Sequence, residues 1–89
     1  MAKVAYVVND VLGRVCEELG VGDYTKIDGH YTFSDYDASL AAVDAYLWNL
    51  LDDEDESNDD RAYDIMEILD TTNYTVMYYS TESASWIPN

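Results

Sequence analysis

Carboxylates dominate the side chains of this sequence that could do chemistry. The chain carries 19 Asp and Glu residues against 4 Lys and Arg residues, a formal net charge of −15 over 89 residues. The densest stretch runs from Asp52 to Asp60. Carboxylates in such numbers can coordinate cations, transfer protons in general acid–base catalysis, or pair with the Arg and Lys side chains of a partner.

Three acidic residues, starting at the end of this stretch, recur at helical spacing. Asp60, Asp64 and Glu67 follow one another at intervals of four and three residues, which puts successive Cβ atoms about 5–6 Å apart on one helix face. Like charges at this spacing destabilise a helix by roughly 0.2–0.5 kcal/mol per pair. Because the stripe costs stability, we expect it to serve a partner.

A second helical segment carries acidic residues along one flank. Asp37, Asp44 and Asp52 are separated by seven and eight residues, or about 10–12 Å at a rise of 1.5 Å per residue. Trp48 lies on the same flank. The two segments together predict an extended anionic surface.

Enzymatic and metal-binding roles are disfavoured. The acidic residues occur in polar runs rather than in apolar surroundings that would separate their pKa values, and no Gly-rich phosphate loop or Ser-His-Asp set is present. A calcium loop starting at Asp53 would place Asn58 where the loop needs glycine, and Asp64 where it needs a bidentate Glu. We therefore expect a protein that is not an enzyme and needs no metal or cofactor.

The lone His30 and Cys16 are interpreted as structural residues. A single cysteine excludes an internal disulfide and fits a reducing compartment. The apolar run near the N-terminus is too short for a signal peptide or a membrane span. These features predict a cytoplasmic location, in a host cytoplasm if the source is a phage.

The first segment, residues 3–19, is predicted to be a helix because valines and leucines recur at intervals of three and four. The same valines have high β propensity, so the sequence leaves open a strand over residues 3–8, with Asn9 or Asp10 capping a shorter helix. Gly13 inside this helix costs about 1 kcal/mol relative to Ala.

The rest of the chain predicts a hairpin, two helices and a strand. Asp28-Gly29 suits a type I′ turn between two short runs within residues 24–33. Ser34 is the expected cap of a helix ending near Leu51, and Ser57 the expected cap of a third helix over residues 58–70. Residues 74–80 form the expected last strand. The fold class is therefore a small single α+β domain over residues 1–89, with three helices packed on a three-stranded antiparallel sheet in the order α-β-β-α-α-β; an all-α bundle is the alternative.

Aromatic residues near the C-terminus offer a second contact surface. Tyr79 and Trp86 are candidate anchors within an acidic rim, because Tyr and Trp are frequent binding hot spots. The predicted partner-binding residues are therefore Asp37, Asp44, Asp52, Asp53, Asp55, Asp59, Asp60, Asp64, Glu67, Tyr79 and Trp86.

The charge and its arrangement predict a DNA mimic. Such an inhibitor occupies the basic groove of a DNA- or RNA-binding protein, for example a restriction enzyme or a CRISPR effector, and binds neither nucleic acid nor membrane itself. Small size and high acidity are properties shared with phage-encoded antirestriction and anti-CRISPR proteins, although no residue pattern assigns the chain to one of those families. Self-association into a homodimer is left open.

The acidic composition is also compatible with an adaptor and with adaptation to high salt. An acidic adaptor or structural protein would keep the charge for solubility and bind its partner through the aromatic face. A protein adapted to high salt would carry the same composition, but it would unfold when salt is removed, whereas a mimic folds at low salt and binds more weakly at high salt.

Overall fold

The computed structural model of the chain describes residues 2–52 and 59–88. Eight helices and strands follow one another along it: β1 (Lys3–Val8), α1 (Asp10–Leu19), β2 (Tyr24–Ile27), β3 (His30–Phe33), α2 (Tyr36–Asp52), α3 (Asp59–Thr71), β4 (Thr75–Ser80) and β5 (Ser85–Trp86). The α+β class is confirmed, and the all-α alternative is wrong.

The first segment is a strand followed by a short helix. The prediction of one helix over residues 3–19 is wrong for residues 3–8, whose valines also suit a strand and which pair with β4 over six residues. Asn9 caps α1, because its side-chain oxygen accepts a hydrogen bond from the backbone N–H of Leu12 at 3.0 Å. Gly20 ends the helix in the left-handed conformation (φ 72°). The alternative of a strand followed by a shorter helix, with Asn9 as its cap, describes the structure.

The predicted hairpin is confirmed. Asp28 and Gly29 both have positive φ angles, 43° and 88°, as a type I′ turn requires. The helix after the hairpin begins one residue later than expected. Its N-cap is Asp35, whose carboxylate accepts from the backbone N–H of Ala38 at 3.0 Å, and not Ser34.

The sheet has five antiparallel strands rather than three, in the order β2-β3-β1-β4-β5. Two strands were missing from the prediction: β1, whose sequence fits two periods, and β5, which has only two residues. β1 pairs with β4 over six residues but with β3 at only two, Val7 and Val8. The central strand of the sheet is therefore the segment that was predicted to be helical.

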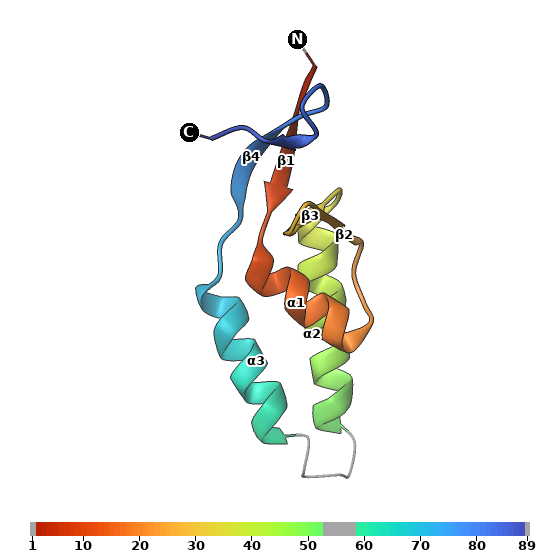
Figure 1. Cartoon of the computed structure of the whole chain (residues 1–89). Helices are drawn as coiled ribbons and strands as arrows, with labels where there is room; N and C mark the ends of the chain where they lie inside the picture. The colour runs from red at the N-terminus through yellow and green to blue at the C-terminus, as the bar shows by residue number, and fades with distance from the viewer. Residues whose placement is uncertain (1, 53–58, 89) are drawn as a thin grey trace.

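The core lies where α1, α2 and α3 meet the β3 end of the sheet. β1, β4 and β5 extend beyond the helices, so the molecule is a rod of 54 × 19 × 19 Å with strands at one end and the α2 and α3 helices at the other (Figure 1). The buried apolar residues come mainly from the helices and β3: Val8, Leu12, Val15, Cys16, Tyr31, Phe33, Val43, Leu47, Ala62 and Ile65.

Candidate functional site

The acidic stripe predicted on the third helix is present. Asp60, Asp64 and Glu67 are exposed on α3, on the side opposite Ala62 and Ile65, which face the core. The stripe is therefore open to a partner along about 10 Å of the helix.

The acidic flank of α2 is also exposed. Asp37, Asp44 and Asp52 all face solvent, and Trp48 beside them is 55% exposed. An indole so open to water on a helix whose other large apolar residues pack inward is a candidate contact. The flank gives the anionic surface one apolar residue.

The link between α2 and α3 lies outside the described residues. Asp53, Asp55 and the predicted cap Ser57 belong to it, so their contribution to the surface stays a prediction. Asp59, at the start of α3, is half-buried, and its Oδ1 has no hydrogen-bond partner within the described part of the chain.

Basic residues do not neutralise this surface. Arg61 is the one basic residue of α2 and α3, and its guanidinium pairs with Glu18 of α1. In residues 2–52 and 59–88, the other ion pair joins Asp10 to His30. The carboxylates of the stripe and the flank therefore have no cationic partner in the described structure.

Charge is divided unevenly between the strands and the helices. The five strands and the turns that join β2 to β3 and β4 to β5 contain Lys3 and Lys26 against Asp28 and Glu82, so this strand end has no net charge. The whole −15 belongs to the helices and their connections. The longest helix, α2, has 17 residues and spans about 26 Å. Duplex DNA carries one charge per ~1.7 Å, or about 15 over that length. The two long helices α2 and α3 carry eight carboxylates against Arg61, a net charge of −7, which is about half the charge of such a duplex.

The aromatic anchors lie on a different surface. Tyr79 and Trp86 are on the strand end, away from the acidic helices (Figure 1). Both are half-buried, because their rings pack on each other with centroids 5.2 Å apart and both contact Tyr6. The more exposed aromatic side chain of β4 is Tyr78, at 40%. The structure therefore does not bring the predicted acidic and aromatic residues into one site.

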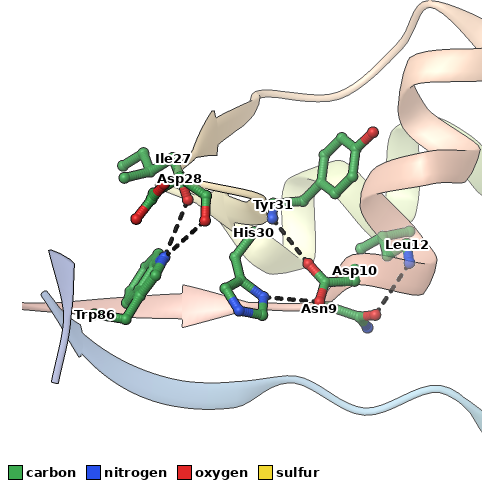
Figure 2. A network of polar contacts seen from close by, with 8 residues as sticks. All are labelled: Asn9, Asp10, Leu12, Ile27, Asp28, His30, Tyr31 and Trp86. Carbon is green, nitrogen blue, oxygen red and sulfur yellow. Dashed lines mark hydrogen bonds and ion pairs between the residues drawn. The ribbon is translucent and has the colours of Figure 1, made fainter. Parts of the chain in front are cut away.

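A polar network at the start of α1 fixes the hairpin to the helix (Figure 2). The carboxylate of Asp10 contacts His30 Nδ1 at 2.8 Å and accepts from the backbone N–H of Tyr31 at 3.0 Å. Partial burial raises the pKa of Asp10, but the hydrogen bonds from Tyr31 and His30 outweigh it, and the net shift of the pKa is downward. Asp10 is therefore an ionised brace between α1 and β3.

The same network continues to the end of the sheet. The ring of His30 packs edge-on against Trp86, with centroids 5.4 Å apart. Trp86 Nε1 donates to the carbonyl oxygens of Ile27 and Asp28 at 3.1 and 3.3 Å (Figure 2). The structural interpretation of His30 agrees with these contacts, and its partners were missed because they are distant in sequence.

Cys16 is also placed as a structural residue. Its side chain is fully buried in the core. Burial, and next the nearby charge of Asp23, raise the pKa of the thiol to about 11. Such a thiol is not a nucleophile near neutral pH.

No other arrangement in the described residues points to chemistry. Over residues 2–52 and 59–88, no group of three or more His, Cys, Asp and Glu side chains is placed to hold a metal ion. No helix in this part of the chain combines the length and apolar character needed to cross a membrane. The exposed carboxylates of α2 and α3 are the most distinctive feature of the surface.

Fold and surface define a small α+β protein with an anionic helical end. No protein-family model, curated protein or solved structure matches the chain.

Proposed function

We propose that the chain is a DNA mimic, which inhibits a nucleic-acid-binding protein by occupying its basic groove. The observation that carries this proposal is the exposed anionic surface of α2 and α3, whose net charge of −7 is about half the phosphate charge of a duplex as long as α2. Arg and Lys side chains that hold phosphates form charge-assisted hydrogen bonds with carboxylates equally well. An antirestriction or anti-CRISPR role encoded by a phage or mobile element belongs to this proposal.

The geometry of the helices supports the proposal further. Asp60, Asp64 and Glu67 rise along one face of α3, and the one cation of that helix, Arg61, forms its ion pair with Glu18 of α1 instead. Their repulsion is a cost that the fold does not recover. A partner rich in Arg and Lys would recover it on binding and would be drawn in quickly by the field of the rod.

The first experiment identifies the partner. The immobilised protein is exposed to bacterial lysate and eluted with a salt gradient, and the eluted proteins are identified by mass spectrometry. The mimic predicts a nucleic-acid-binding protein that salt releases and that duplex or single-stranded nucleic acid displaces. A partner that neither salt nor nucleic acid displaces would contradict the mimic and favour the acidic adaptor.

The second experiment locates the surface with two matched double variants. Asp64→Asn with Glu67→Gln removes two charges from α3, and Asp28→Asn with Glu82→Gln removes two from the strand end. Both leave the same net charge, so they separate the α3 surface from charge in general. The α3 variant should slow association by about tenfold, and the strand-end variant should change it little. Equal effects of the two variants would refute the assignment of the site.

A further inference from the structure

The strand end of the rod differs from the helical end in net charge, and so in whether a second copy of the chain could approach it. Its two lysines balance Asp28 and Glu82, whereas every other large surface of the molecule belongs to the part that carries −15. Two copies that met through their helical ends would bring like charges together. Two copies that met through the strand ends would keep the carboxylates of α3 and of the far end of α2 well separated, since the rod is 54 Å long and the Debye length is about 8 Å at physiological salt.

β1 has an open edge at this end. Thr81 donates its backbone N–H to the carbonyl of Ala2 at 3.0 Å, which fixes the alternation of hydrogen bonds in the ladder between β1 and β4. The N–H and C=O groups of Lys3 and Ala5 therefore point away from β4, toward the side of β3.

β3 does not reach these groups. Its pairing with β1 covers Val7 and Val8 and ends at Phe33, where the chain turns away toward α2. Ala5 borders a hollow between β1 and the hairpin, lined also by Thr25, Ile27 and Phe33 among others. In the described structure, Lys3, Val4 and Ala5 are exposed, and no strand pairs with them on the side of β3.

The side chain at the middle of this edge is apolar and open. Val4 is 39% exposed, and it lies between the two residues whose backbone groups are free. An exposed strand edge with an apolar side chain at its centre is a template for another strand. Two copies of the same edge can pair with each other, because an antiparallel pair of identical strands can form about a two-fold axis.

We propose that the chain forms a symmetric dimer in which β1 pairs antiparallel with β1 of a second copy. Lys3 of one copy lies opposite Ala5 of the other, which makes about four hydrogen bonds between the copies. Val4 then lies opposite Val4 on the two-fold axis. The two sheets become continuous, and the acidic helical ends project in opposite directions. This proposal does not depend on the function proposed above.

Sedimentation of the purified protein tests the dimer directly. From micromolar to millimolar concentration the mass should rise from 10.1 kDa to twice that value. Because the strand end as a whole carries no net charge, the dissociation constant should change little with NaCl and should not depend on divalent cations. A protein that stays monomeric over this range overturns the proposal.

Two matched valine variants locate the interface. Val4→Lys places like charges opposite each other on the axis and should weaken the dimer by about tenfold or more. Val76→Lys is the control, because Val76 lies on the neighbouring strand β4 at a similar exposure, 44%, and not on the open edge; it should leave the dimer unchanged. Equal effects of the two variants overturn the proposal.

Mixing two variants with opposite charges at position 4 distinguishes a lost interface from a folding defect, because misfolded variants would not associate when mixed. Val4→Lys and Val4→Glu should each be mainly monomeric alone, and their equimolar mixture should form a heterodimer, because opposite charges then face each other. Ala5→Pro removes a free edge N–H without breaking the ladder with β4, and it should abolish the dimer while the protein stays folded by circular dichroism. Failure of the mixture to associate overturns the assignment of β1 as the interface.

Discussion

Replacing Gly13 by Ala should destabilise the protein although Ala is the better helix former. α1 crosses β3 so closely at this point that a Cβ on Gly13 would overlap the side chain of Tyr31, including its Cδ1 at 2.5 Å. The overlap also involves the Cβ of Tyr31, which is attached directly to the backbone and cannot rotate away. The helix and the strand must therefore separate to admit the methyl group.

The expected magnitude follows from two opposing effects. Ala is favoured over Gly inside a helix by about 1 kcal/mol. Overpacking a core costs typically 1–3 kcal/mol and occasionally more, and this site is at the upper end because the clashing atoms are fixed to the strand backbone. The net loss should be about 2 kcal/mol. That loss lowers the urea midpoint by about 2 M at a slope near 1 kcal/mol/M, and the melting temperature by roughly 10 °C.

Urea unfolding of a small set of variants checks this reasoning. Tyr31→Ala retains the clashing Cβ, so Gly13→Ala should still destabilise in that background. In the Tyr31→Gly background the clash is gone, and Gly13→Ala should stabilise by about 1 kcal/mol. If Gly13→Ala raises the urea midpoint of the otherwise unchanged protein, α1 does not pack this closely on β3 and the reasoning is refuted.

The pH dependence of stability, the reactivity of Cys16 and the absence of DNA binding can each be measured directly. Because the pKa of Asp10 is lowered in the folded protein, its ionised form stabilises the fold above the unfolded pKa of about 3.9. The difference in melting temperature between the protein and Asp10→Asn should be full at pH 6 and disappear as the pH falls through the lower folded pKa. A difference that does not shrink would contradict the role of Asp10 as a brace between α1 and β3. Burial raises the pKa of Cys16 to about 11, so an alkylating reagent at pH 8 should modify the thiol only after urea unfolds the protein, and fast labelling of the folded protein would refute the burial. A gel-shift titration at low salt should show no complex with bare DNA, because the 4 Lys and Arg residues cannot replace the counterions of a duplex, and a specific complex would exclude the mimic.

Local signals in the sequence predicted the hairpin and two of the helices correctly. Asp28-Gly29 fixes a turn whose φ angles few other residue pairs adopt, so the hairpin depends little on the rest of the fold. The predicted inward faces of α2 and α3 were correct, because an apolar stripe at helical spacing can be buried only by turning that face of the helix toward the core.

The segment over residues 3–8 could not be assigned from local signals. Val4, Val8 and Val11 recur at helical intervals, and the same valines suit a strand. The decision comes from β4, which lies about 70 residues away and supplies a six-residue ladder. The partners of His30 were out of reach for the same reason, since Asp10 and Trp86 meet it only in the folded chain.

The sequence predicted which residues form the acidic surface, but not that the strands and their turns carry no net charge. Net charge and spacing indicated an anionic track on α3. That the strand end carries no net charge became apparent only once residues 2–8, 24–33 and 75–88 were seen to belong to one sheet. Tyr79 and Trp86 were predicted to share a surface with the acidic residues because the sequence does not show that both lie in the sheet, away from α2 and α3.

The ladder between β1 and β4 also governs how the chain acquires its structure. It joins Lys3 to Ser80 and so encloses nearly the whole described chain in one loop. Pairing across such a separation is slow, because the entropy of closing the loop is lost before the ladder forms. During synthesis on the ribosome, β1 must wait until residue 80 has emerged, while the hairpin and helices between them already have their partners. We therefore expect the backbone amides of β1 and β4 to gain protection from hydrogen exchange together, in the last step of folding.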